Sequence, residues 1–580
     1  MSLRLTYTFL ALVIVLSGIV RLIGIDQVPT SINNDQLHYA TNAKFFFLTG
    51  RDFSGGITLP EVLLFQYPKN ELPQAELPFF LAFPFVGIFP FSLTLLVLPN
   101  VILSCATVLV MYLIVRKLFG NTKMALIAAL VTAINPWMIY IGRTSYEVVP
   151  ATFFYLLSFY VLLVARGWKI LYVVPILLLA FYSYIGTKLI FVPLVVLMLI
   201  YTYFFIHKKN YGMQYILVGI SSLVLMLFFL FQIQSGADSS RAGEIVFFNH
   251  SSITESVDTL RKTTVDTPFV SLFDNKYTVY GRLLIANLLH IFDPDYLFLH
   301  GDNFFSVGRH GLFYVIDAIF ILIGGAWLFI KKKSLFFFLS AFFVLATAPQ
   351  IFHNSLGAGN FTPHIALIFP VLIIFISCGI ASVIDYFKKS NKVNLSSLLL
   401  AGVYLASFSY FLHVYFFQFP LQSGIYDFPS RILSRYLVLA SENEKKSLVV
   451  YSSEVPILLK KYLFYSNTIT KDTVPQIRSG TQDNRYTIHN VVFVPCDDKE
   501  KRDPTKWIAI YSNLCSNVPS GKRIGIPQLQ DSGSTYYIYE DILCTQHKLE
   551  RYIRKVVLSD ISVEKYSSEK FCQTFVLAVD

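Results

Sequence analysis

The feature that most constrains this 580-residue chain is a series of long apolar segments separated by short clusters of lysine and arginine. An apolar segment of about 17–25 residues is long enough to cross the hydrocarbon core of a bilayer as a helix. Charged residues make up only 14% of the chain, well below the roughly 25% of a soluble protein. The pattern predicts a polytopic α-helical membrane protein with about eleven spans, near residues 5–25, 95–115, 124–141, 148–166, 170–185, 189–206, 212–233, 311–330, 335–350, 365–385 and 395–416.

The basic residues sort the connecting loops into two alternating sets. One set of short loops carries almost no positive charge beyond Arg143 and Lys188. Because cytoplasmic loops are enriched in lysine and arginine, this alternation predicts a cytoplasmic N-terminus. We expect the first span to stay uncleaved, since its apolar run to Ile25 is longer than a signal-peptide core and no small-residue cleavage site is evident. The net charge of +11 is therefore an orientation signal and not a nucleic-acid-binding patch. The basic set holds Arg4, Arg116, Lys117, Lys123, Arg166, Lys169, Lys208, Lys209, Lys331, Lys332, Lys333, Lys388, Lys389 and Lys392.

This topology places three long segments outside the membrane, at residues 26–94, 234–310 and 418–580. Four prolines between residues 73 and 90 predict extracytoplasmic juxtamembrane helices in the first segment, either interfacial or re-entrant. The last segment alternates short apolar runs, such as 447–451 and 491–494, with turn residues, which predicts a soluble α/β domain. We therefore expect a transmembrane domain over 1–417 and an extracytoplasmic C-terminal domain over 418–580.

The six cysteines divide between these two regions. Cys105 and Cys378 lie within predicted spans, where we expect inert thiols. Four more lie in the C-terminal region, at Cys496, Cys515, Cys544 and Cys572, and they permit two disulfides with three possible connectivities in an oxidising compartment. Since none has CxxC spacing, we expect no zinc site.

The first candidate for chemistry follows the first span, in the stretch Pro29–Ala43. Asn33, Asn34 and Asp35 are helix-capping residue types, and no helix breaker follows up to Phe47, so a helix is predicted to start near Asp35. Asp35 would then be fixed on a rigid element near the outer membrane face. The alternative is that Asp35 does no more than cap this helix.

Three further outer loops carry candidate residues. In the motif Asn135-Pro136-Trp137-x-x-Tyr140-x-x-Arg143-x-x-x-Glu147, the two charged residues could act on a substrate or pair with each other across one helical turn. Arg309 and His310, before the eighth span, could bind a phosphate or anchor the interface. His353 and His364 lie in the loop before the tenth span, where a histidine is more often structural.

The order of these features resembles glycosyltransferase superfamily C, in the branch of protein O-mannosyltransferases and lipid A aminoarabinose transferases. The resemblance covers roughly residues 1–420. It rests on Asp35 with Tyr39 in the first outer loop, although Gln36 stands where the family has a second carboxylate. It rests further on the Asn135–Glu147 motif, on the loop 299–311, and on the histidine-containing segment 349–370, in which Ile365 replaces a frequent arginine.

The resemblance implies an inverting transfer of a sugar from a polyprenyl-phosphate donor to an acceptor hydroxyl of a glycan, lipid or protein. An alcohol is a poor nucleophile, so a carboxylate must take its proton, and Asp35 is the family-matched base, with Glu147 orienting the acceptor or a basic residue. Cations must stabilise the leaving phosphate, for which Lys69, Arg143, Lys188, Arg309 and His310 are candidates. The remaining pocket candidates are Asn34, Tyr39, Asp302, His353 and His364. A divalent cation is used by some relatives, but one acidic residue per loop offers few ligands.

The rival class is a transporter or flippase of lipid-linked sugars, which should carry ionisable groups near span centres. Here they gather at the outer ends of the spans, and Asp317 is the main exception, so the enzyme is favoured. A non-catalytic scaffold would leave Asp35, Arg143, Glu147 and Arg309 unexplained. The C-terminal domain could bind an acceptor or cover the site. High Phe, Ile, Lys and Asn usage suggests an AT-rich genome, and we expect a bacterial plasma membrane.

Overall fold

The computed structural model describes residues 2–66, 74–235, 250–352, 361–389, 393–421, 426–442, 446–500, 502–527, 533–545 and 557–579. The chain forms two compact units. Unit 1 comprises Met1–Leu22, Glu61–Pro78 and Asn100–Leu412, and unit 2 comprises Ile23–Pro60, Phe79–Pro99 and His413–Asp580. Part of the first predicted outer segment therefore belongs to the same unit as the C-terminal region. The predicted domain boundary at residue 417 stays a prediction.

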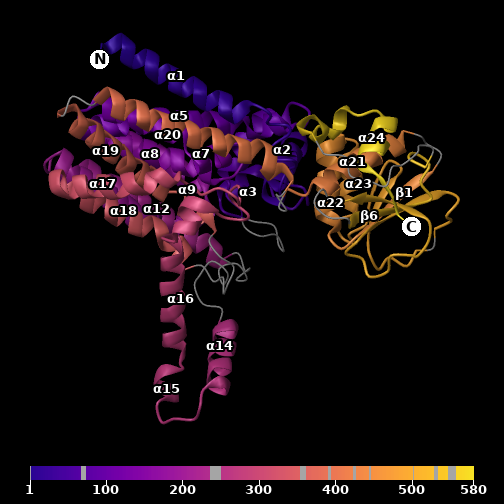
Figure 1. Ribbon diagram of the computed structural model, residues 1–580. Coiled ribbons are helices and arrows are strands. Elements are labelled where there is room, and N and C mark those ends of the chain that lie inside the picture. Colours follow the sequence, from indigo (N-terminus) through magenta and orange to yellow (C-terminus); the bar gives the residue numbers. More distant parts are fainter. Residues whose placement is uncertain are drawn as a thin grey trace. The chain divides into compact units, whose positions relative to one another are not determined.

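Unit 1 is helical, and a helical segment lies at each of the eleven predicted spans (Figure 1). Its helices are α1 (Leu3–Leu22), α5 (Leu93–Phe119, which begins in unit 2), α6 (Thr122–Ile134), α7 (Pro136–Gly142), α8 (Val148–Val164), η2 (Gly167–Tyr172), α9 (Val173–Ser183), α10 (Ile185–Lys188), α11 (Phe191–Tyr201), η3 (Thr202–Ile206), α12 (Gly212–Ser235), α14 (His250–Thr263), α15 (Val270–Phe273), α16 (Lys276–Ile291), η4 (Asp295–Leu299), α17 (Val315–Lys331), α18 (Lys333–Ile351), η5 (Thr362–Ile365), α19 (Ile368–Lys389) and α20 (Val393–His413).

The length and composition of the helices support some of the eleven predicted membrane spans. Within the described ranges, six helices are long and apolar enough to cross a membrane, and the pair α6–α7, bent by 57°, makes up to seven. The other predicted spans coincide with shorter helices: α8, η2–α9, α11–η3 and α17. A helical membrane protein is thus confirmed, and the number eleven stays a prediction.

Glycines decide how closely two of these helices approach each other. A Cβ added at Gly324 of α17 would lie 1.8 Å from the carbonyl oxygen of Phe375 on α19, and one at Gly379 would lie 2.2 Å from that of Phe320. Only glycine fits where two helix backbones touch in this way. This contact keeps α17 and α19 together.

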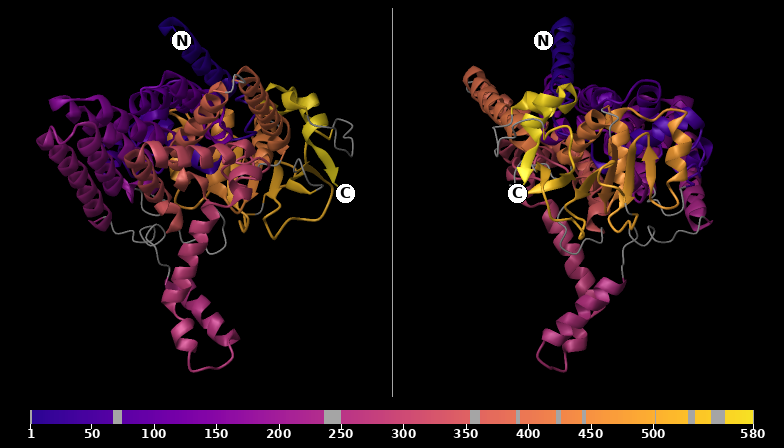
Figure 2. Two further views of the ribbon diagram at one scale, coloured as in Figure 1. Left: turned by 60° about the vertical axis from the view of Figure 1, so that its left-hand side comes forward. Right: turned by 90° about the vertical axis from the view of Figure 1, so that its right-hand side faces the viewer.

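Figures 1 and 2 show α14 and α16 as a two-helix hairpin that projects from the other helices of unit 1.

The described residues of unit 2 contain a mixed sheet, seen in the right-hand view of Figure 2. Its seven strands lie in the order β2-β3-β1-β4-β6-β5-β7. Strand β1 pairs in parallel with β3 and β4, and the other pairs are antiparallel. The strands are β1 (Ser447–Ser452), β2 (Tyr486–Ile488), β3 (Val491–Pro495), β4 (Trp507–Ser512), β5 (Arg523–Pro527), β6 (Ser534–Tyr539) and β7 (Leu577–Val579). The predicted α/β domain is confirmed.

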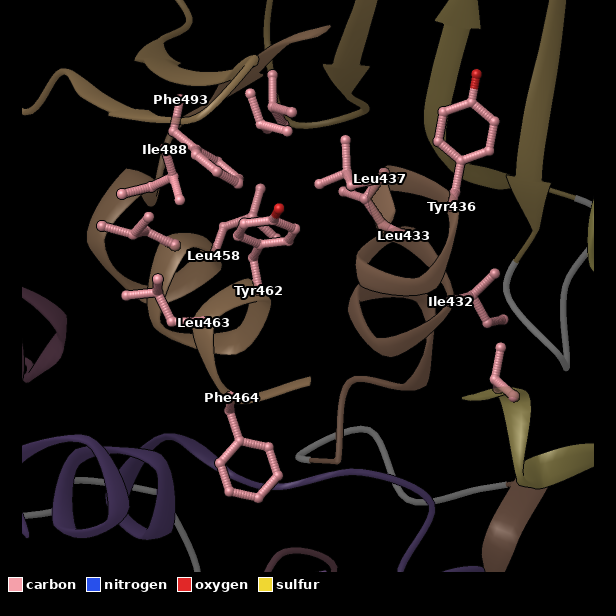
Figure 3. Close-up of a cluster of buried hydrophobic side chains, with 14 of the residues drawn as sticks. Ile432, Leu433, Tyr436, Leu437, Leu458, Tyr462, Leu463, Phe464, Ile488 and Phe493 are labelled. Carbon is pink, nitrogen blue, oxygen red and sulfur yellow. The ribbon is translucent and has the colours of Figure 1, made fainter. Parts of the chain in front are cut away.

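Helices cover one face of this sheet and form the main core of unit 2. Alternate strand residues face opposite sides, so Leu448 and Val450 of β1 lie in the helical core while Val449 and Tyr451 face away. Figure 3 shows Leu437 of α21 and Leu458 of α22 within this core. The helical elements of unit 2 are α2 (Asn34–Thr49), η1 (Phe83–Gly87), η6 (Val414–Gln418), η7 (Phe419–Leu421), α21 (Phe428–Ser441), α22 (Val455–Ser466), α23 (Thr473–Ser479), η8 (Leu558–Ile561), η9 (Val563–Lys565) and α24 (Ser568–Phe575), while α3 (Leu59–Leu63) and α4 (Leu77–Ala82) lie at the limits between the units.

Two disulfides join the four C-terminal cysteines, as predicted. The connectivity that the sequence left open is Cys496–Cys515 and Cys544–Cys572. Cys105 and Cys378 are free thiols.

Candidate functional site

The first turn of α2 carries the predicted base, Asp35. The helix starts at Asn34, and its N-cap is Asn33, whose side chain accepts a hydrogen bond of 2.9 Å from the backbone N–H of Gln36. The Gln36 side chain accepts in return from the backbone N–H of Asn33, which completes a capping box. Asp35 therefore does not cap the helix, and it is exposed. Because the N-terminus of a helix carries partial positive charge, negative charge is stabilised there.

The segment that leads into α2 is held by α21, α22 and η9, all within unit 2. The Tyr465 hydroxyl lies 2.8 Å from the Ser31 hydroxyl and accepts from the Ile32 N–H at 3.0 Å. Arg431 donates to the Thr30 carbonyl at 2.6 Å and forms a two-pronged ion pair with Glu564 at 2.7 and 2.8 Å. Bidentate pairs of this kind add geometric definition. The position of Asp35 in unit 2 is therefore fixed by packing and not left to a loose loop.

The next turn of α2 places a histidine beside a lysine of α22. His38 Nε2 lies 2.7 Å from Asn42 Nδ2, and His38 Nδ1 lies 3.5 Å from Lys460 Nζ. Burial lowers the pKa of His38 well below 6.5, and the charge of Lys460 lowers it further. His38 is thus neutral near pH 7. Among the pocket candidates, Asn34 is exposed, and Tyr39 is buried with its ring 4.9 Å from that of Phe79.

In unit 1, the Asn-Pro-Trp motif supports a loop that is distant in sequence, around residues 304–312. Asn135 caps α7 by accepting from the Met138 N–H at 2.9 Å, and its Nδ2 donates to the Leu312 carbonyl at 3.1 Å. Trp137 Nε1 donates to the Phe305 carbonyl at 3.2 Å, and the Tyr140 hydroxyl donates to the Phe304 carbonyl at 3.2 Å. The motif thus fixes the loop that precedes α17.

Asp302 closes the same loop and ties it to η5. Its carboxylate accepts from the Phe304 N–H at 2.7 Å and from the N–H and hydroxyl of Thr362 at 3.0 and 2.7 Å. Gly311 is required at the end of the loop, since an added Cβ would lie 2.2 Å from the Phe298 carbonyl carbon. The structure therefore brings together three predicted regions: the Asn135 motif, the loop around residue 302, and the segment of His364.

The predicted phosphate-binding cations have different surroundings. Arg309 is exposed on the rigid loop just described. His310 is buried, donates through Nδ1 to the Gly311 carbonyl at 2.8 Å, and has its pKa lowered by burial. Arg143 is completely buried and donates to the Val20 carbonyl at 2.8 Å. Lys69 and His353 lie outside the described residues.

Lys188 lies in a buried ion pair that the sequence did not reveal. Its Nζ is 2.7 and 2.9 Å from the two carboxylate oxygens of Glu76, and the side chains are 2% and 0% exposed. The ammonium also lies 4.8, 5.3 and 4.6 Å from the ring centres of Phe65, Phe181 and Phe229.

The electrostatics around Lys188 also involve a predicted catalytic residue. Burial lowers the pKa of Lys188, while the negative charges of Glu76 and Glu147 act in the opposite direction. Glu147 is half-buried at the N-terminal end of α8, where its side chain makes no capping hydrogen bond.

The predicted pocket residue His364 lies among aromatic side chains. Its ring lies 6.3 Å from that of Tyr184 and 4.5 Å from that of Phe361. No group of three or more His, Cys, Asp or Glu side chains able to hold a metal occurs among the residues that the structure describes.

Two charged residues with structural importance were missed from the sequence. Glu76 is the one charged residue of the apolar, proline-rich stretch 72–90, and a rare charge in such a place is a signal that could have been used. Arg21, near the end of α1, is buried and donates to Ser104 at 2.8 Å and to the Ala133 and Met138 carbonyls at 3.1 and 3.0 Å. It locks α1 against α6 and α7.

Comparison with known proteins gives likenesses of fold only. No family model and no curated protein sequence matches the chain. Among solved structures, it is similar to the archaeal oligosaccharyltransferase AglB from Archaeoglobus fulgidus in complex with an inhibitory peptide and a dolichol-phosphate, at 11% identity over 92% of this chain and 74% of that one, with a TM-score of 0.47. It is also similar to ArnT from Cupriavidus metallidurans bound to undecaprenyl phosphate, at 10% identity over 93% and 98% of the chains, with a TM-score of 0.49. Similarity at this level carries no argument about activity, which has to come from the residues.

Proposed function

We propose that this chain is a membrane glycosyltransferase that moves a sugar from a polyprenyl-phosphate donor to an acceptor hydroxyl at the outer membrane face. The observation that carries the proposal is the first turn of α2. Since Asn33 and Gln36 form the capping box, capping does not account for the exposed carboxylate of Asp35. The order of outer-face motifs, which resembles that of glycosyltransferase superfamily C, supports the same assignment.

In the proposed reaction, the carboxylate of Asp35 accepts the proton of the acceptor hydroxyl while the hydroxyl oxygen bonds to the anomeric carbon. The bond from that carbon to the phosphate oxygen breaks, and polyprenyl phosphate leaves with the electron pair. One displacement inverts the configuration of the anomeric carbon. A positioned general base contributes about 10²–10⁴-fold to the rate.

The leaving phosphate needs a cation, and we assign this role first to Arg309 because of its place in the order of the outer-face motifs. Arg309 is exposed on a loop that Asp302 and the Asn135 motif hold in place, so it would meet an anion with little loss of conformational freedom. Arg143, His310 and Lys188 are buried, which makes them second choices for direct phosphate contact. Glu147, whose charge acts on Lys188, is assigned to orientation within unit 1.

The test is transfer from a panel of polyprenyl-phosphate hexoses and pentoses by the purified full chain in liposomes. We expect release of polyprenyl phosphate together with a sugar joined to an added glycan, lipid or peptide acceptor. Inversion is checked by nuclear magnetic resonance of the product. Intact donor that crosses the bilayer without release of polyprenyl phosphate would contradict the proposal and favour the transporter.

A further inference from the structure

The sheet face of unit 2 that the helices leave uncovered carries a cavity of about 560 Å³. This volume lies in the range of about 300–1,000 Å³ that is usual for ligand pockets. The floor is formed by aromatic side chains of the central strands. The rings of Tyr451 on β1 and Tyr511 on β4 stack at 4.3 Å with an interplanar angle of 4°, and Tyr539 on β6 meets Tyr511 edge-on at 5.7 Å.

Covalent and ionic links hold the walls of this cavity. The disulfide Cys496–Cys515 joins the loop after β3 to the loop after β4. The side chain of Arg502 is 8% exposed and that of Asp498 is fully buried, and they pair at 2.9 Å. Arg502 also donates to the Tyr451 hydroxyl at 3.1 Å. The cavity is therefore a preformed feature of the domain and not a gap between mobile loops.

The polar groups of the cavity indicate what kind of ligand it accepts. Most of its charged side chains are already paired: Asp498 and Glu500 with Arg485 and Arg502, and Glu540 with Lys446 at 3.8 Å. The described lining therefore offers little unpaired charge of either sign, which suits an uncharged ligand. Burial, together with neighbouring Tyr451, raises the pKa of Tyr511 to about 12, so its hydroxyl is a hydrogen-bond donor at neutral pH. The exposed amide of Asn517 adds both a donor and an acceptor. The acidic lining residues are Asp497, Asp498, Glu500 and Glu540.

We propose that this cavity binds an uncharged saccharide. A sugar ring presents C–H groups on its faces, which pack on aromatic rings, and hydroxyls at its edge, which pair with carboxylate, amide and phenol groups. The aromatic floor, with the Tyr511 hydroxyl and the Asn517 amide in the lining, meets both requirements. A phosphate would find Arg502 already engaged by Asp498 and Glu500.

The cavity lies on the opposite side of the sheet from α22, and α22 packs against α2, which carries Asp35. It is therefore separate from α2 and would hold a part of a glycan remote from the reacting hydroxyl. The assignment of this glycan as the acceptor rests on the proposed function, whereas saccharide binding does not. A polymeric acceptor is then expected to have a lower KM than a single sugar, with kcat little changed.

The experiment is titration of the full chain in lipid nanodiscs with neutral tetrasaccharides of glucose, mannose, galactose or N-acetylglucosamine, followed by calorimetry. We expect at least one to bind, with Kd raised at least 10-fold in Tyr511→Ala and about 3–10-fold in Asn517→Ala, since a hydrogen bond is worth about 0.5–1.5 kcal/mol. Asn517 is exposed, so its variant tests the site even if Tyr511→Ala fails to fold. Asn513→Ala is the matched control for Asn517→Ala, because Asn513 is also exposed but lies outside the cavity lining, and it should leave Kd unchanged.

Several results would overturn the site. They are no binding of any neutral saccharide, equal binding by Asn517→Ala and wild type, or preference for phosphorylated over neutral sugars. Sugar transfer to a single-sugar acceptor, measured in parallel, separates the two proposals. Saccharide binding without transfer from any donor would refute the proposed function but support the saccharide site. Sugar transfer without saccharide binding would support the proposed function and refute the saccharide site.

Discussion

Glu76→Gln should strongly destabilise unit 1, because it leaves the ammonium of Lys188 buried without its partner. The two groups are 2.7 Å apart and at most 2% exposed. At an effective dielectric constant of about 20, their attraction is about 6 kcal/mol before desolvation is subtracted. Removal of one partner of a buried pair costs about 3–5 kcal/mol. With about 2 °C per kcal/mol in a large domain, we expect Tm to fall by about 6–10 °C.

The double variant Glu76→Leu/Lys188→Met separates a structural role of Lys188 from a role in donor binding. Replacement of a buried ion pair by apolar residues of similar volume is often neutral or stabilising. If Lys188 serves only the pair, the double variant recovers both Tm and sugar transfer. If Lys188 binds the donor phosphate, Tm recovers but the KM for the donor stays high.

The assay is thermal unfolding of the full chain in nanodiscs, together with donor-dependent transfer kinetics, for wild type, both single variants and the double variant. The coupling energy follows from the four values. Single variants that lower Tm by less than about 2 °C would refute the reasoning, since they would show that the pair is not buried as described.

Three smaller predictions concern caps, loops and pH. Asn33→Ala should lower the free energy of unfolding by about 1 kcal/mol and speed hydrogen exchange at the start of α2. An equally large effect of Asp35→Asn would contradict this and show that Asp35 caps the helix. Asp302→Asn weakens hydrogen bonds to a carboxylate and should cost about 1.5–3 kcal/mol of stability, and lost transfer with unchanged Tm would instead indicate ligand contact. Burial acts to raise the pKa of Glu564, but Arg431 outweighs it and the pKa lies below 4.5, so the pair stabilises unit 2 above that pH and this stability is lost as the pH falls through the lowered pKa. The difference in Tm between wild type and Glu564→Gln should then shrink from pH 7 to pH 3, and a constant difference would contradict this.

Local and periodic features were predictable from the sequence. Apolar length located a helical segment at each proposed span, and residue types near Asp35 located the start of α2 to within one residue. The short apolar runs at 447–451 and 491–494 became β1 and β3. These features depend on hydrophobic burial and capping, which act between residues close in sequence.

Long-range pairing was not predictable in the same way. Lys188 is bound to Glu76, 112 residues away, and Trp137 to a carbonyl 168 residues away. Nothing in either local sequence specifies such a partner. The Asn135 motif was read as chemistry, yet the contacts of Asn135, Trp137 and Tyr140 show that it supports a loop. The disulfide connectivity and the strand order likewise depend on the fold as a whole.

The most direct test of the central claim is the rate of sugar transfer by Asp35→Asn relative to wild type. Asp472→Asn is the matched control, since Asp472 is also exposed at a helix N-terminus in unit 2 and makes no capping hydrogen bond through its side chain. If Asp35 is the base, kcat falls about 10²–10⁴-fold with Tm unchanged, while the control stays at the wild-type rate. A kcat within a factor of about two of wild type in Asp35→Asn would contradict the assignment.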